Sequence, residues 1–228
     1  MQRLSEVKKI GLLGGTFDPV HKGHLAVVTH VHRVLALDGV WFIPAASPPH
    51  KSAHGDALPI TFFQDRVAML ERALASYDKF EVSRIEAELS TPSYSIDTLR
   101  ELRKRVAEKT EFSFILGADA FAEIDTWKQY TGLTDLADLV IISRADNDPG
   151  IVEKTIRKYF SGFKPFSNDN IWSSDEHTGS LIQVFMEPVP ISSTMVRQKV
   201  RRNLDVSSLV PAEVAEYIRE RNLYRSAR

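Results

Sequence analysis

Short apolar runs alternate along this chain with longer stretches in which apolar residues recur at helical spacing. The first run, Lys9 to Leu13, ends at the glycine pair Gly14 and Gly15, and helical spacing then extends from Leu25 to Leu37. This beginning predicts a strand, a glycine turn and a helix. Further strands are expected at 40–43, 80–84, 112–116, 139–143 and 181–186. Further helices are expected at 60–76, 95–107, 192–202 and 211–221.

This alternation predicts an α/β fold with a doubly wound, mainly parallel sheet of five to six strands and helices on both faces. We expect a single domain over residues 1–228, with a C-terminal helical part at about 192–228. Between about 146 and 176 the pattern blurs around an amphipathic piece, Ile151 to Phe160, and we interpret this stretch as an insertion. Ligands of such sheets bind at the carboxyl ends of the strands, so the site is expected at the first glycine turn.

Composition and charge restrict the classes of partner. The 228 residues are 43% hydrophobic and 26% charged, and 29 basic against 30 acidic residues leave a formal charge of -1. No global positive field draws such a chain onto nucleic acid or a membrane, so small-molecule partners are expected, with a homo-oligomer as a possible assembly. The absence of cysteine excludes disulfides, zinc thiolates and a cysteine nucleophile. A charged N-terminus and the lack of a membrane-length apolar run predict a cytoplasmic protein.

The segment from Gly14 to His24 reads G-G-T-F-D-P-V-H-K-G-H and lies between the first expected strand and helix. Adjacent glycines let a phosphate or an adenine approach the backbone, and the helix start offers unpaired N–H groups to an anion. His21 and His24 are one helical turn apart, so both imidazoles can face the same triphosphate. A plain tight turn followed by a surface helix would explain any one of these residues, but their joint occurrence makes that alternative weaker.

Two other interpretations of this region are disfavoured. The segment contains neither G-x-G-x-x-G nor the P-loop pattern, so it is not one of the two familiar nucleotide-binding glycine motifs. His30 and His32 suggest a metal site together with His21 and His24, but residues two apart on a helix point to opposite faces. We therefore interpret both as ordinary helix residues and predict no metal ligands.

Two further segments bring positive charge to the same edge of the sheet. P-A-A-S-P-P-H-K follows the second strand and ends in Lys51, which can pair with phosphate, although a solvated proline loop explains it equally well. I-S-S-T-M-V-R opens a later helix, where Ser193, Thr194 and Arg197 would form a second anion cradle. A serine N-cap is the plainer interpretation of the hydroxyl cluster.

Candidate acceptor contacts follow the fourth strand. F-I-L-G-A-D places Asp119 at the ligand edge, where it suits either a ribose hydroxyl or the cap of the next helix. Tyr94, Trp127 and Tyr130 offer aromatic faces on which a pyridine ring could stack, with core packing as the competing explanation, and Trp127 is the preferred candidate.

Together these motifs resemble those of bacterial nicotinate-nucleotide adenylyltransferases, in the HxGH nucleotidyltransferase superfamily. The resemblance spans nearly the whole chain and includes P-P-H-K, S-Y-S-I-D-T-L at 93–99, L-G-A-D at 116–119, Trp127 and the two helix-opening motifs. It implies a Rossmann-like nucleotidyltransferase fold. It also implies transfer of AMP from ATP to nicotinate mononucleotide, with Mg²⁺ accompanying ATP and with nicotinate adenine dinucleotide and pyrophosphate as products. Ser95, where the family often has threonine, and the length of 146–176 depart from the pattern.

The resemblance implies roles for individual residues as well. Four are implied at the reacting phosphates, where His24 would steady the growing charge: His21, His24, Lys51 and Arg197. Six are implied around ATP: Gly14, Gly15, Thr16, Phe17, Ser193 and Thr194. Four are implied around the acceptor: Tyr94, Ser95, Asp119 and Trp127.

Such a reaction needs no protein nucleophile, because the acceptor phosphate is already ionised and the protein only aligns two anions and offsets their charge. Two alternatives stay open. One is an adenylyltransferase for nicotinamide mononucleotide or phosphopantetheine, against which P-P-H-K and Trp127 argue. The other is a sensor that binds ATP without chemistry, which the full set of expected charged residues disfavours.

Overall fold

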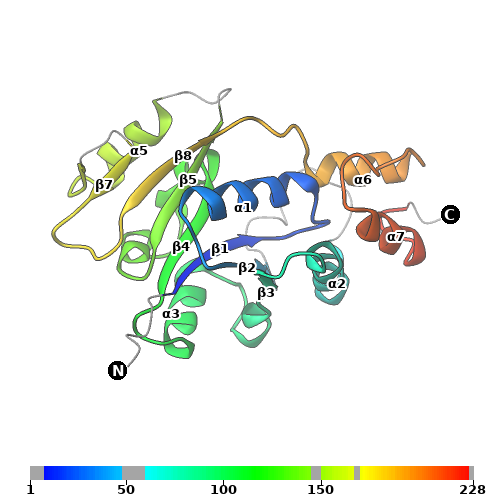
Figure 1. Ribbon diagram of the computed structural model, residues 1–228, viewed down its shortest axis with the longest axis horizontal. Coiled ribbons are helices and arrows are strands. Elements are labelled where there is room, and N and C mark those ends of the chain that lie inside the picture. The colour runs from blue at the N-terminus through cyan, green and yellow to red at the C-terminus, as the bar shows by residue number, and fades with distance from the viewer. Residues whose placement is uncertain (1–7, 48–59, 145–149, 167–169, 226–228) are drawn as a thin grey trace.

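The computed structural model describes residues 8–47, 60–144, 150–166 and 170–225 (Figure 1). Its sheet has the strand order β3-β2-β1-β4-β5-β8-β7-β6. Six strands pair in parallel: β1 (Lys9–Gly15), β2 (Gly39–Pro44), β3 (Phe80–Val82), β4 (Glu111–Gly117), β5 (Asp138–Arg144) and β8 (Leu181–Met186). Two short strands complete the sheet by antiparallel pairing at the β8 edge: β7 (Ile171–Ser173) and β6 (Lys164–Pro165).

Helices cover both faces of this sheet. The α-helices are α1 (Lys22–Val34), α2 (Phe63–Leu74), α3 (Ser95–Arg105), α4 (Ala118–Ala122), α5 (Ile151–Tyr159), α6 (Ser193–Arg201) and α7 (Ala212–Glu220). One hydrophobic core joins the sheet to α1, α2, α6 and α7, and a second joins its other face to α3, α4 and α5. Along β1, Leu13 belongs to the first core, whereas Ile10 and Leu12 belong to the second. Burial on both faces explains why the strands are continuous apolar runs in the sequence.

The predicted class is confirmed, but the sheet has eight strands, six of them parallel, where five to six were expected. The two extra strands lie in the segment predicted as an insertion, and runs of two and three residues are too short to show a periodic pattern. α1 begins at Lys22, whereas helical spacing of apolar residues begins only at Leu25. The first turn of the helix is polar, so the apolar pattern does not reveal it. Among the described residues, no helix has the length and apolar character needed to cross a membrane.

Candidate active site

Neighbouring strands β1 and β4 both end in glycine at the carboxyl edge of the sheet. A Cβ atom added to the exposed Gly14 would meet only the Phe114 ring, at 3.8 Å, and one added to Gly117 would meet nothing within 4 Å. The packing of the protein therefore does not require glycine at either position. Bare backbone facing open space at strand ends is where a ligand can approach closely.

Two histidines meet at the start of α1. The Nδ1 atom of His24 accepts a hydrogen bond of 3.2 Å from the backbone N–H of His21, the N-cap residue. The two imidazole rings are stacked, with centroids 3.7 Å apart and an interplanar angle of 22°. Because Nδ1 of His24 is an acceptor, neutral His24 carries its proton on Nε2, which makes that nitrogen a donor on the other side of the ring. The one-turn spacing thus brings the two imidazoles together as the sequence predicts.

The Phe17 side chain packs against His24 inside the protein and is not exposed to solvent. Its backbone is left-handed, with φ of 50°, a conformation that costs a bulky residue about 1–3 kcal/mol and persists only when its surroundings hold it. The Phe17 ring is buried and packs edge-on against His24, with centroids 5.0 Å apart, and against Phe42. Thr16 is also buried. Of the predicted ATP-lining turn, Gly14 is exposed and Gly15 is partly exposed.

The start of α6 docks onto the same turn from the other end of the chain. Ser192 is the N-cap, and its Oγ accepts a hydrogen bond of 3.1 Å from Met195 N–H. Ser193 Oγ donates to the carbonyl of Pro19 at 2.9 Å, so its proton is already engaged. Arg197 donates from Nη1 to the carbonyl of Asp18 at 2.6 Å and from Nη2 to Thr194 Oγ1 at 3.1 Å. Ser192 therefore caps α6, as the plainer interpretation of the hydroxyl cluster predicts. The Ser193 hydroxyl instead binds the backbone of the turn at Pro19.

The starts of α1 and α6 lie side by side at one end of the sheet (Figure 1) and share a cavity of about 350 Å³. Its lining includes His21, His24, Ser193, Thr194 and Arg197. His24 also lines a second cavity of about 160 Å³, together with Leu13, Gly117 and Asp119. His24 therefore lies where the two cavities meet.

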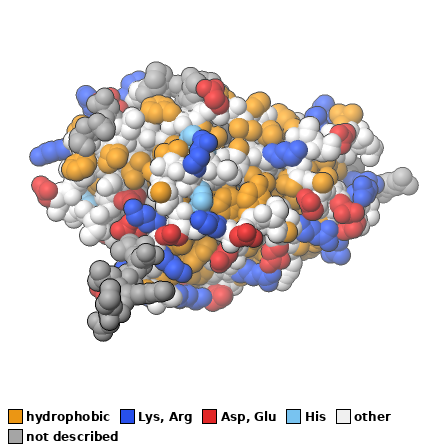
Figure 2. Space-filling model, viewed as in Figure 1, with side chains coloured by type: hydrophobic (Ala, Val, Ile, Leu, Met, Phe, Trp, Pro, Cys, Tyr) orange, Lys and Arg blue, Asp and Glu red, His pale blue; other side chains and the backbone are white. Residues whose placement is uncertain are grey.

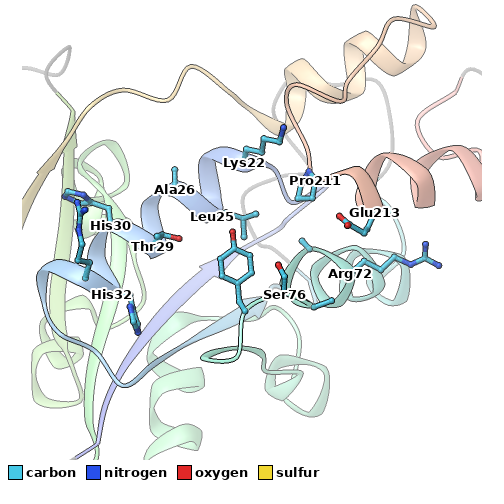
Figure 3. Close-up of a pocket in the computed structure, with 14 residues that line it drawn as sticks. Lys22, Leu25, Ala26, Thr29, His30, His32, Arg72, Ser76, Pro211 and Glu213 are labelled. Carbon is cyan, nitrogen blue, oxygen red and sulfur yellow. The ribbon is translucent and has the colours of Figure 1, made fainter.

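A cavity of about 860 Å³, larger than either cavity at His24, lies elsewhere along α1 and is shared with α2 and the beginning of α7 (Figure 3). On this face apolar side chains gather over the middle of the molecule, with histidine and basic side chains among them (Figure 2). His30 and His32 both line the cavity but differ in their contacts: His30 Nε2 lies 3.0 Å from the carbonyl of Phe185, and the His32 ring packs edge-on against Phe80. In the described part of the chain, no group of three or more metal-ligating side chains is gathered in one place.

Three of the four residues predicted for the acceptor lie outside the two cavities at His24: Tyr94, Ser95 and Trp127. Trp127 packs edge-on against Phe114, with centroids 6.3 Å apart, and the Nζ atom of Lys128 lies 4.8 Å from the centre of the Tyr94 ring. Tyr94 is the N-cap residue of α3 and Ser95 is its first residue. Both aromatic rings are partly buried against the second core, and neither borders the two cavities at His24 as far as the chain is described.

Asp119 is the remaining predicted site residue whose position the structure describes. Asp119 is exposed in the first turn of α4, whose N-cap is Gly117, so Asp119 does not cap that helix. Lys51 lies outside the described residues.

Two buried charged residues, Arg66 and Glu86, were not predicted from the sequence. Arg66 is only 1% exposed, and its guanidinium donates to the carbonyls of Thr16 at 2.7 Å, Ala45 at 2.7 Å and Thr61 at 3.0 Å. It thereby ties the ends of β1 and β2 to the segment before α2. Burial lowers the pKa of Arg66, and the nearby Asp18 acts in the opposite direction. The signal was available, because Arg66 lies on the apolar stripe of α2 at helical spacing from Met69, Leu70 and Ala73.

Glu86 also joins separate segments, beside the helix that Tyr94 caps. Its carboxylate accepts hydrogen bonds from Thr98 Oγ1 at 3.0 Å and from Ala46 N–H at 3.2 Å, joining α3 to the loop that follows β2. Burial raises the pKa of Glu86, and the hydrogen bonds from neighbouring side chains oppose that rise. No local sequence pattern distinguishes this residue from the surface glutamates around it.

Comparison with known proteins identifies the family. The cytidylyltransferase-like family model matches residues 12–199. A protein of Trichlorobacter lovleyi named probable nicotinate-nucleotide adenylyltransferase is 34% identical over 95% of this chain and 99% of its own length. A protein of Thermus thermophilus with the same name is 36% identical over 95% of this chain and 100% of its own length. The chain belongs to the nicotinate-nucleotide adenylyltransferase family.

Solved structures agree with this family at the level of the fold. Nicotinic acid mononucleotide adenylyltransferase of Plasmodium falciparum, in complex with NaAD, superposes with a TM-score of 0.68 at 19% identity, covering 95% of this chain and 97% of that one. A putative family member from Vibrio parahaemolyticus gives a TM-score of 0.62 at 14% identity, covering 96% and 97% of the two chains. The Rossmann-like nucleotidyltransferase fold that the resemblance implied is thereby confirmed.

Proposed function

We propose that this protein transfers the adenylyl group of ATP to nicotinate mononucleotide and releases nicotinate adenine dinucleotide and pyrophosphate. The observation that carries the proposal is the cavity shared by His24 and Arg197, onto which the starts of α1 and α6 both open. Helix starts offer N–H donors to anions, so this arrangement suits the triphosphate of a nucleotide. Relatives named for this activity match the chain over nearly its whole length.

In the proposed reaction a 5'-phosphate oxygen of the acceptor forms a bond to the α-phosphorus of ATP. The bond from the α-phosphorus to the oxygen that bridges to the β-phosphorus breaks, and its electron pair leaves with pyrophosphate. The attacking oxygen is already ionised, so the protein aligns the two anions and offsets their charge. His24 would present its Nε2–H group to the developing charge, and His21 and Arg197 would contact the phosphates from the same cavity. Lys51, which follows β2 in the sequence, is proposed to assist.

Mg²⁺ is proposed to enter with ATP as part of the substrate. This ion prefers oxygen ligands, keeps several waters and is commonly held through substrate phosphates. The side chains that line the shared cavity offer imidazole, hydroxyl and guanidinium groups, which suit phosphate better than a bare Mg²⁺ ion. Magnesium–ATP is therefore the form of the nucleotide that this site fits.

The acceptor is proposed to extend from His24 along the end of β4. Asp119 lies in the smaller cavity beside His24, where its carboxylate could accept a hydrogen bond from a ribose hydroxyl. Tyr94, Ser95 and Trp127 are proposed to surround the nicotinate ring from the corner beside Phe114. The proposed location is the cytoplasm, a reducing compartment that a chain without cysteine suits.

An acceptor comparison tests this function. Purified protein is supplied with magnesium–ATP and, in separate reactions, nicotinate mononucleotide, nicotinamide mononucleotide or phosphopantetheine, and pyrophosphate release is followed. We expect the fastest release with nicotinate mononucleotide, together with a dinucleotide product of the expected mass. Faster release with either other acceptor would reassign the substrate. ATP binding without pyrophosphate release from any of the three would support the sensor alternative instead.

Gly14→Ala tests the contact between backbone and nucleotide. The added Cβ atom has 3.8 Å of clearance, so the fold should accept it and even gain roughly 0.5–1 kcal/mol, the usual preference of a strand for alanine over glycine. At the proposed site the same methyl group meets the nucleotide, and we expect the KM for ATP to rise about tenfold, or roughly 1.4 kcal/mol of binding. Steady-state kinetics and thermal unfolding measure the two effects.

Gly132→Ala is the matched control, because its added Cβ atom would meet only Ile96, at 3.6 Å, in a segment away from the cavities. Its KM for ATP should equal that of the original protein. Equal KM values for Gly14→Ala and Gly132→Ala would remove Gly14 from the nucleotide site.

A further inference from the structure

Tyr224 follows α7 near the C-terminus, yet its side chain reaches the glycine turn at the other end of the chain. Its hydroxyl donates a hydrogen bond of 2.7 Å to Oδ1 of Asp18, a residue 206 positions earlier. Both side chains are buried, with Tyr224 7% exposed and Asp18 4% exposed. The Tyr224 backbone is left-handed, with φ of 62°, which an aromatic residue rarely adopts unless its surroundings hold it there.

Asp18 connects this tyrosine to the phosphate side of the site. Its Oδ2 atom accepts a hydrogen bond of 3.1 Å from Thr61 N–H, and its backbone carbonyl accepts the 2.6 Å hydrogen bond from Arg197 Nη1. The carbonyl of the next residue, Pro19, accepts from Ser193 Oγ. Tyr224 therefore holds the side chain of Asp18, and the backbone carbonyls of Asp18 and Pro19 hold two side chains of α6.

The contact is suited to a lasting structural task. Burial, together with the neighbouring charge of Asp18, raises the pKa of Tyr224, so its hydroxyl stays protonated and remains a donor. The donor has a carboxylate partner out of water, where such a hydrogen bond is stronger than one between neutral groups. A phenylalanine at this position would keep the ring packing and remove only the hydrogen bond.

We propose that Tyr224 is a positioning residue for the reaction: acting through Asp18, it fixes Arg197 at the cavity that Arg197 shares with His21 and His24. The inference rests on the proposed adenylyl transfer. Tyr224 itself lines neither cavity at His24, so its effect passes through the turn rather than through contact with the substrate.

The chain supplies a matched control in Tyr217. Its hydroxyl donates to Oδ1 of Asp65 at 2.8 Å, so the two hydrogen bonds have the same chemistry and nearly the same length. Both tyrosines lie in the C-terminal part, but Asp65 belongs to α2 and does not touch Arg197 through any hydrogen bond described for it. Tyr217→Phe therefore removes an equivalent hydrogen bond away from the turn.

The first measurement compares the kinetics of Tyr224→Phe and Tyr217→Phe with the original protein, after thermal unfolding has shown that both are folded. We expect Tyr224→Phe to lower kcat on the order of tenfold with little change in KM for ATP, since small displacements of aligned groups act on the chemical step. Tyr217→Phe should keep the original kcat. A loss confined to melting temperature, or equal kcat values in the two variants, would overturn the inference.

The second measurement uses no substrate and so separates this inference from the proposed function. Hydrogen exchange is followed in residues 14–24 and 192–198 of each folded variant. We expect faster exchange in both segments for Tyr224→Phe and original rates for Tyr217→Phe. Unchanged exchange in Tyr224→Phe would overturn the inference, whereas a failure of the original protein to transfer AMP to any acceptor would overturn only the proposed function.

Discussion

His24→Ala is expected to lower kcat on the order of a hundredfold or more, the usual result of removing one aligned donor to developing charge. The protein should remain folded, because His24 is partly exposed at the junction of two cavities and its loss leaves the apolar face of α1 intact. Steady-state turnover with magnesium–ATP and nicotinate mononucleotide measures the effect, and circular dichroism checks the fold.

Two variants separate the chemistry of His24 from its place in the helix. His24→Asn keeps an acceptor near the position of Nδ1 for the backbone N–H of His21, but lacks a group at the position of Nε2. It should restore whatever stability alanine loses and still fail to turn over. His30→Ala removes an imidazole from the same helix at a site away from both cavities and should leave turnover unchanged. Near-normal turnover in His24→Asn would exclude Nε2 from the mechanism.

Arg66→Met is expected to have the largest effect on stability, about 3–5 kcal/mol, because it breaks a buried charge arrangement by removing one member. The substitution leaves the carbonyls of Thr16, Ala45 and Thr61 without their donor and leaves Asp18 and Glu86 without the positive charge between them. Chemical denaturation measures the free energy of unfolding.

Arg72→Met is the matched control on the same helix. Arg72 lies over the ring of Tyr217, and its ion pair with Glu220 is exposed, with a side-chain exposure of 40% for the arginine. An exposed ion pair contributes about 0–1 kcal/mol, so this variant should lose little stability. Similar losses of unfolding free energy in Arg66→Met and Arg72→Met would show that the buried guanidinium contributes no more to stability than the exposed one.

Most of the fold could be predicted because the buried strands leave apolar runs in the sequence, as the four consecutive buried residues from Leu139 to Ile142 in β5 illustrate. α4 was not predicted, since five residues are too few to show a helical period. β6 and β7 escaped prediction for the same reason.

In the candidate site, contacts between residues close in sequence could be predicted, whereas contacts between distant residues could not. That His21 and His24 lie close together could be predicted from their spacing, because an N-cap residue and the residue three positions later are neighbours at a helix start. The stacking of their rings was not predicted. The hydrogen bond between Arg197 and Asp18 joins residues 179 positions apart, and no local pattern encodes such a pairing. Motif order suggested that the two segments converge, but the atoms that join them depend on the strand order and on how the helices pack.

The contact between Tyr224 and Asp18 also sets a sequence of events during synthesis. Asp18 leaves the ribosome early, and the hydroxyl group that holds it is translated 206 residues later. The turn at Asp18 therefore acquires this restraint only after residue 224 has been added to the chain. A copy that ends before residue 224 would carry every residue implied at the phosphates and still lack the tyrosine that we propose to position them.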